Sequence, residues 1–124
     1  MAMAFHGGGN GGGGAALPRG AMRALTVQVV ADRGGSWVAV RGELDLATAD
    51  RLWYAIADVL SGVGSGRLTL DLSGVGFIDA RGVHVLLDAA HACARQGIAL
   101  RILATPAVRR VCTLADVSGE LPID

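Results

Sequence analysis

Lysine is absent from this chain of 124 residues, and all eleven basic side chains are arginines. The sequence therefore offers neither a Schiff-base lysine nor the lysine of a phosphate-binding loop. Cysteine is scarce too: Cys93 and Cys112 are too few for a disulfide framework and are typical of a reducing compartment. No apolar run reaches about 18 residues, and no basic leader precedes an apolar block, so neither a membrane-spanning helix nor a secretory signal is predicted.

An excess charge of either sign is also missing, because eleven acidic side chains balance the eleven arginines. No overall field therefore attracts nucleic acid or an anionic membrane surface. The chain is rich instead in apolar residues, at 52%, and in glycine, with eight of its 19 glycines in the first twenty positions. We expect residues 1–22 to be a disordered glycine-rich segment and residues 23–124 to form one domain.

The expected domain alternates strand and helix patterns. Period-two alternation of apolar residues predicts strands at 25–29, 68–72 and 98–102, and the apolar run Trp37-Val38-Ala39-Val40 predicts another. Apolar spacing of three and four predicts helices at 47–60 and 80–96, and a third helix opening at Thr105-Pro106. The first two strands flank turn residues and form an antiparallel hairpin, whereas helices that follow strands favour parallel crossovers. The order predicts an α/β fold with a mixed sheet.

Asp79 directly precedes the second predicted helix and is placed as its N-cap. The free N–H groups of a helix start can receive an anion or the acceptor groups of a partner. A cap that only stabilises its own helix, by about 1 kcal/mol, fits the same residues. Both interpretations remain open from the residues alone.

Three potential metal ligands share one face of that helix: His84, Asp88 and His91. Arg81 and Arg95 extend the same face, opposite the apolar one, and two cations weaken metal binding. We interpret this face as solvated and expect no metal site.

No catalytic set is visible in the sequence. Cys93 and Cys112 lie on apolar stripes, which favours buried packing thiols over a redox pair. Glu43 and Asp45 are close in sequence, but no His, Lys or Tyr lies near them to complete an acid–base pair. We therefore expect that the chain is not an enzyme and needs no cofactor.

Four groups of residues form a longer pattern across residues 25–123. They are Gly42-Glu43-Leu44-Asp45 with Thr48-Ala49, Leu70-Asp71-Leu72-Ser73-Gly74-Val75, Phe77-Ile78-Asp79 with Gly82-Val83, and Pro106-Ala107-Val108-Arg109-Arg110. In this order and spacing the chain resembles the STAS domain, and within it the bacterial anti-sigma factor antagonists. The resemblance implies a STAS-like mixed sheet of four to five strands flanked by helices.

The resemblance also implies a partner. In that family an anti-sigma factor with a kinase-type ATPase fold holds a sigma factor inactive. The unphosphorylated antagonist binds the anti-sigma factor and thereby frees the sigma factor. The kinase phosphorylates the hydroxyl residue directly after the aspartate that corresponds to Asp79. The contact surface implied for this chain comprises Glu43, Asp45, Thr48, Asp79, Ala80, Arg81 and Gly82.

This sequence departs from the family pattern at the phosphorylated position. Ala80 has no oxygen to accept a phosphoryl group, and Arg81 replaces a second hydroxyl. A cation in the first turn of a helix is disfavoured by about 0.3–1 kcal/mol, which Asp79 nearby would offset. The leading hypothesis is a cytoplasmic antagonist-like protein that binds a kinase-type anti-sigma factor and cannot be phosphorylated at Ala80. The alternative is a STAS sensor or scaffold module that binds a small ligand or a subunit of a transporter or signalling complex.

Overall fold

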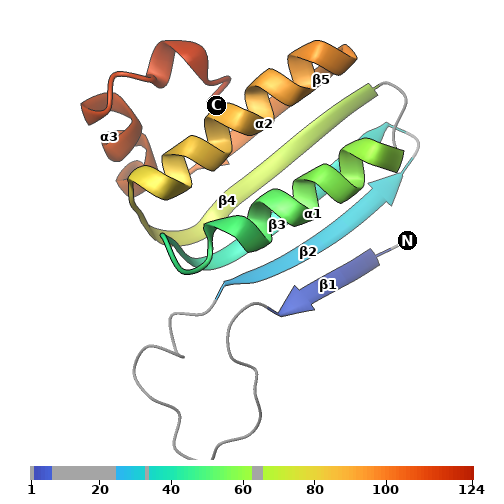
Figure 1. Ribbon diagram of the computed structural model, residues 1–124, viewed down its shortest axis with the longest axis horizontal. Helices are drawn as coiled ribbons and strands as arrows, with labels where there is room; N and C mark the ends of the chain where they lie inside the picture. Colours follow the sequence, from blue (N-terminus) through green and yellow to red (C-terminus); the bar gives the residue numbers. More distant parts are fainter. Residues whose placement is uncertain (1, 7–24, 33, 63–65) are drawn as a thin grey trace, which may run out of the picture.

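The computed structural model describes residues 2–6, 25–32, 34–62 and 66–124. Its strands are β1 (Ala2–His6), β2 (Thr26–Asp32), β3 (Gly35–Leu44), β4 (Gly66–Ile78) and β5 (Ile98–Ala104). Its helices are α1 (Ala49–Gly62), α2 (Ala80–Gln96), α3 (Pro106–Leu114) and the 3₁₀ helix η2 (Ser118–Glu120). The strands form one sheet in the order β1-β2-β3-β4-β5 (Figure 1). The first two pairings are antiparallel and the last two parallel, so the predicted mixed α/β sheet is confirmed.

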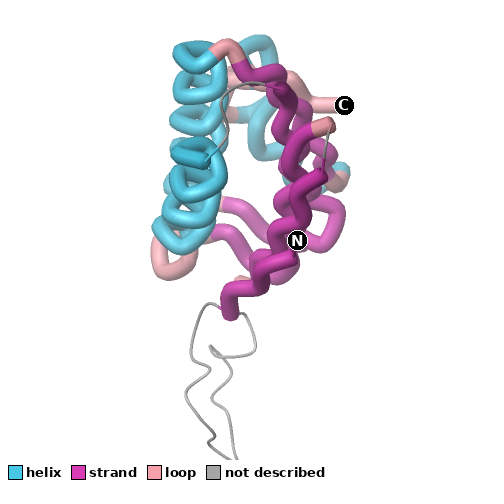
Figure 2. The backbone as a smooth tube through the Cα atoms, turned by 90° about the vertical axis from the view of Figure 1, so that its right-hand side faces the viewer, coloured by secondary structure: helices cyan, strands magenta, loops and turns pink. Residues whose placement is uncertain are grey.

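One face of the sheet is covered by α1 and α2, which lie side by side against the strands (Figure 2). The strand residues that point to these helices are buried, as in β4, where Leu68, Leu70 and Leu72 are at most 1% exposed. α3 packs against β4 and β5. No described helix covers the opposite face of the sheet, and among the described residues no helix is long and apolar enough to span a membrane.

The helix boundaries confirm the capping signals of the sequence. Asp79 is the N-cap of α2, and Gly97 ends that helix in the left-handed conformation at φ 71°. Thr105 caps α3, its hydroxyl accepts the Val108 N–H, and Pro106 occupies the first turn. These caps fix where α2 and α3 begin relative to the strands before them.

The structure corrects the expectation for the first residues of the chain. Residues 1–22 were expected to be disordered, but Ala2–His6 form β1 and pair antiparallel with β2. This pairing gives the backbone groups along the edge of β2 hydrogen-bond partners. The remainder of that segment, residue 1 and residues 7–22, lies outside the described residues.

Two strands are also longer than their alternation predicts. β3 continues to Leu44 and β4 to Ile78, so Glu43 belongs to a strand and not to a loop. Register shifts between β3 and β4 let the pairing continue past Gly74, where a Cβ would lie 2.8 Å from Cγ of Arg41. Gly74 therefore serves for the close approach of β3 and β4.

Candidate functional site

The candidate site lies at the edge of the sheet where the parallel strands β3 and β4 end together. Leu44 and Ile78 are partners in the register, and the chain leaves each of them to begin a helix. Figure 1 shows that α1 and α2 start at this same end of the sheet. We call the surface formed by residues 45–48 and by residues 79–82 the helix-start site.

Asp79 connects the two halves of the helix-start site. Its Oδ1 accepts hydrogen bonds from the backbone N–H groups of Arg81 at 2.9 Å and Gly82 at 3.1 Å. Its Oδ2 accepts the N–H of Leu46 at 3.1 Å, from the turn before α1. Its own N–H donates to the carbonyl of Leu44 at 3.2 Å. The carboxylate therefore both caps α2 and fixes the neighbouring turn, and it occupies the N–H groups that an external anion would need.

Asp45 and Thr48 stabilise the turn before α1. The Asp45 carboxylate accepts the N–H groups of Ala47 at 3.0 Å and Thr48 at 3.2 Å, while the buried Thr48 hydroxyl donates to the Glu43 carbonyl at 2.7 Å. The helix consequently begins at Ala49, two residues later than predicted. Both polar groups are engaged within the chain, so their contribution to the surface is to hold its shape.

Gly82 allows α2 to begin directly against the ends of β3 and β4. A Cβ at this position would lie 2.7 Å from the Leu44 carbonyl oxygen and 2.7 Å from Cγ1 of Ile78. Contacts this short do not occur in real structures, so only glycine fits without a shift of the helix. The glycine is a positioning residue for the site.

Ala80 and Arg81 form the tip of the helix-start site. Ala80 is exposed and presents only a methyl group. The Arg81 guanidinium donates from Nη2 to Oδ1 of Asp50, in the first turn of α1, at 2.6 Å. We expected Asp79 to offset the charge of Arg81 in the first turn of α2. In the structure Asp79 accepts the backbone N–H of Arg81, and Asp50 pairs with the Arg81 guanidinium.

Sequence reasoning missed two apolar residues beside Asp79. Leu46 is 77% exposed within the turn, and Phe77 is 47% exposed near the end of β4. Large exposed apolar side chains around a rigid polar centre are typical of protein-binding surfaces. An apolar residue in a turn, such as Leu46, is a signal that the sequence does contain. The pairing of Asp50 with Arg81 has no local signal, because the two residues lie 31 positions apart in sequence.

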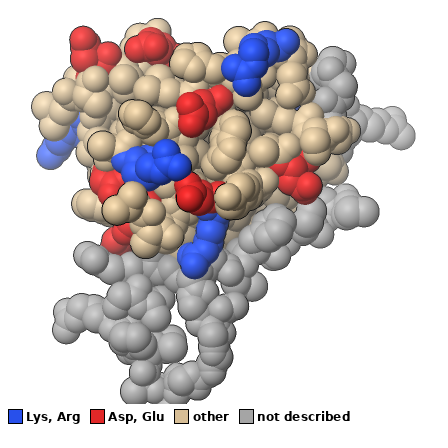
Figure 3. All heavy atoms as spheres, in the orientation of Figure 1, with Lys and Arg blue, Asp and Glu red and all other residues tan. Residues whose placement is uncertain are grey.

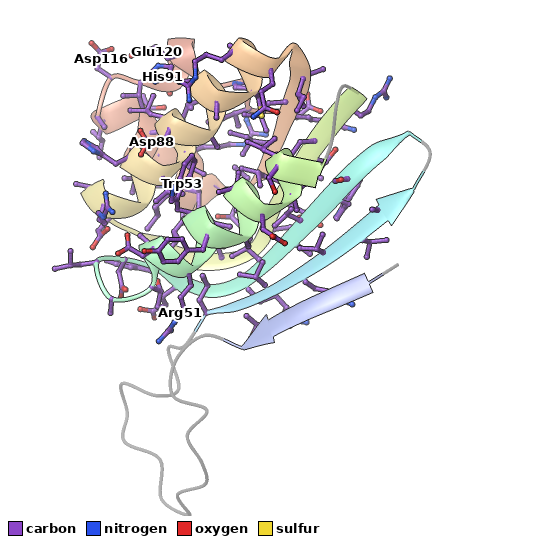
Figure 4. The ribbon with its side chains drawn as sticks, turned by 45° about the vertical axis from the view of Figure 1, so that its right-hand side comes forward. Arg51, Trp53, Asp88, His91, Asp116 and Glu120 are labelled. Atoms are coloured by element: carbon purple, nitrogen blue, oxygen red, sulfur yellow. The ribbon has the colours of Figure 1, made fainter. Side chains whose placement is uncertain are left out.

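The other candidate residues do not join the helix-start site. His84, Asp88 and His91 are exposed, so the interpretation of a solvated face is confirmed, and Figure 4 shows Asp88 and His91 along α2 away from its first turn. No group of three or more potential metal ligands occurs among the described residues. Figure 3 shows acidic and basic side chains interspersed over the helix-covered face, without a patch of one sign.

Both cysteines are buried and unpaired in disulfides. Burial raises the pKa of the Cys93 thiol and of the Cys112 thiol above the ordinary value. Thiols in this state are poor nucleophiles at neutral pH. The predicted packing role is therefore consistent with their environment.

A mixed sheet with helices α1 and α2 on one face is the arrangement that the resemblance to the STAS domain implies. The family model described as Mlab, STAS domain matches residues 27–123, and the chain therefore belongs to the STAS domain family. A search of curated proteins finds no match.

Solved structures agree with this assignment. An anti-sigma factor antagonist from Mycobacterium paratuberculosis is 31% identical with a TM-score of 0.71, over 80% of this chain and 84% of that chain. The antagonist SpoIIAA in its unphosphorylated form is 19% identical with a TM-score of 0.62, over 79% of this chain and 87% of that chain. Part of the murine anion transporter Solute Carrier 26 family member A9 is 20% identical with a TM-score of 0.59, over 73% of this chain and 16% of the transporter. The last two likenesses show the fold alone.

Proposed function

We propose that this chain is an anti-sigma factor antagonist that binds a kinase-type anti-sigma factor through the helix-start site and so controls the availability of a sigma factor. The observation that carries the proposal is the 31% identity to an anti-sigma factor antagonist over most of both chains. The protein acts by contact in the cytoplasm and has no catalytic role of its own.

The geometry of the site supports a binding role. Asp79 holds α2 and the turn before α1 in one arrangement. Leu46, in that turn, and Phe77, two residues before Asp79, are exposed apolar side chains that a partner can contact. Ala80 lies exposed at the centre, where a partner would meet it. The polar groups around these apolar side chains already have hydrogen-bond partners within the chain. Their burial by a partner protein therefore adds little desolvation cost, and this favours association.

Ala80 also determines how the complex is controlled. A phosphoryl group needs a hydroxyl oxygen, and a methyl side chain supplies none. Phosphorylation at position 80 therefore cannot end the interaction. The amount of the protein then sets the amount of free sigma factor.

Calorimetry with the kinase-type anti-sigma factors of the same organism tests the proposal. Each titration is run with ATP and with ADP, for the wild-type chain and for Ala80→Ser, and intact masses are recorded afterwards. We expect the wild type to bind without a gain in mass and Ala80→Ser to gain one phosphate. Ala107→Ser, at another exposed alanine in the first turn of a helix, is the matched control and should gain none. Failure of both the wild type and Ala80→Ser to bind would overturn the proposal.

A further inference from the structure

A second candidate site lies on the face of the sheet that no described helix covers. A cavity of about 410 Å³ opens there, and Trp37, Arg67, Thr69 and Arg101 contribute to its lining. The strand register places Trp37 beside Thr69 and Thr69 beside Arg101, in one row across β3, β4 and β5. Arg67 precedes Thr69 by two residues and so lies on the same face. The volume falls within the range of small-molecule sites, about 300–1,000 Å³.

Trp37 gives this cavity a fixed apolar wall. Its side chain is 40% exposed, which is unusual for so large an apolar group, and its indole N–H donates to Oδ2 of Asp71 at 3.3 Å. Partial burial raises the pKa of Asp71, but hydrogen bonds from Ser73 and Trp37 outweigh that effect and hold the pKa below its ordinary value. Asp71 therefore stays charged and keeps the indole oriented. Val30, next to Trp37 in the register, extends the apolar surface.

Arg67 gives the cavity its charge. The lining contains two arginines and no acidic side chain. Arg101 is paired with Asp124, whereas Arg67 is exposed and makes no ion pair within the described part of the chain. A guanidinium presents two parallel N–H donors, the geometry that matches a carboxylate. A ligand with one carboxylate would therefore meet Arg67 without displacing an ion-pair partner among the described residues.

Thr69 adds a hydrogen-bonding group to the lining. Its side chain is 6% exposed and lies between the row neighbours Trp37 and Arg101. No hydrogen bond from another described side chain reaches its hydroxyl. A ligand in the cavity can bond this hydroxyl in place of water.

We propose that this cavity binds a small aromatic carboxylate, with the ring against Trp37 and Val30 and the carboxylate on Arg67. The ring would cover apolar surface that is now in water, and the Thr69 hydroxyl would bond a carboxylate oxygen. This site lies on the sheet face opposite α1 and α2, and the proposal does not depend on the proposed function.

Nuclear magnetic resonance on the full chain tests the proposal, because its two indole N–H signals report on different faces. Trp37 lines the cavity, whereas Trp53 belongs to α1. We expect 2-naphthoate to shift the Trp37 indole signal saturably and to leave that of Trp53 in place. The uncharged 2-naphthamide has the same ring and should bind about five- to ten-fold more weakly, since it lacks the ion pair. Equal binding of the two compounds, or no saturable shift of Trp37 at millimolar naphthoate, would overturn the proposal.

Two arginine variants separate the cavity from general surface charge. Arg67→Gln should weaken naphthoate binding by about five- to ten-fold. Arg41→Gln is the matched control, because Arg41 is exposed on the same face of β3 but does not line the cavity. An equal loss of binding in both variants would show a diffuse electrostatic attraction and contradict the assignment of Arg67. The Trp53 signal verifies that each variant is folded.

Discussion

The substitution Gly82→Ala gives the sharpest test of how the helix-start site is built. The new Cβ would lie 2.7 Å from the Leu44 carbonyl oxygen, 2.7 Å from Cγ1 of Ile78 and 2.9 Å from Cγ of Leu44. The Ile78 side chain can adjust, but the Leu44 oxygen belongs to the backbone of β3 and cannot rotate away. The first turn of α2 therefore has to move off the ends of the two strands.

The expected magnitude follows from two opposing effects. Forcing one extra methyl group into a packed region costs about 1–3 kcal/mol. Alanine is a better helix former than glycine by up to about 1 kcal/mol, which offsets part of this cost. We expect Gly82→Ala to lower the free energy of unfolding by about 1–2 kcal/mol. Because the shift also separates Asp79 from Leu46, the proposed binding of an anti-sigma factor should weaken by more than the loss in stability accounts for.

Urea unfolding of the wild type and the variant measures the effect. The dependence of the free energy of unfolding on urea concentration should be the same for both proteins. Gly76→Ala is the control, because a Cβ at Gly76 meets no atom within 4 Å. It should change the free energy of unfolding by less than about 0.5 kcal/mol. A Gly82→Ala protein as stable as the wild type would refute the reasoning about close approach.

Two smaller predictions concern charge and thiol chemistry. The Arg81–Asp50 pair is solvent-accessible, so a double-mutant cycle with Arg81→Gln and Asp50→Asn should give a coupling in unfolding below about 1 kcal/mol, decreasing with salt. A coupling that is larger and insensitive to salt would contradict this interpretation. Because burial raises the pKa of Cys93 and Cys112, their thiolates are scarce at neutral pH and increase only as the pH rises above the ordinary value of 9.0. A disulfide reagent at pH 7 should therefore label them at the rate of unfolding, and rapid labelling of the folded protein would show that they are reactive.

Local signals made much of the fold predictable. The alternation of Leu68, Leu70 and Leu72 and the caps at Asp79 and Thr105 each depend on a few adjacent residues. These features gave the strands β2 to β5 and the helices α1 to α3 in the correct order. The mixed pairing followed because helices that connect neighbouring strands require them to be parallel.

The departures from prediction depend on contacts between distant residues. β4 extends past Gly74 because this glycine lies against Arg41 of the neighbouring strand, a contact that no local pattern reveals. β1 forms because β2 offers an unpaired edge. The pairing of Arg81 with Asp50 likewise joins the first turns of two helices through the geometry of the sheet edge.

The same contacts bear on the proposed interaction at the helix-start site. The carboxylates of Asp79 and Asp45 accept hydrogen bonds from backbone N–H groups of the same chain. The backbone at the site is therefore held in place before a partner binds. A preorganised surface loses less conformational entropy on association. Arg81 is the charged group of the tip, and a partner carboxylate that approaches it must compete with Asp50. We therefore expect affinity to come mainly from Leu46 and Phe77 and to vary little with salt, in contrast to an interface governed by charge.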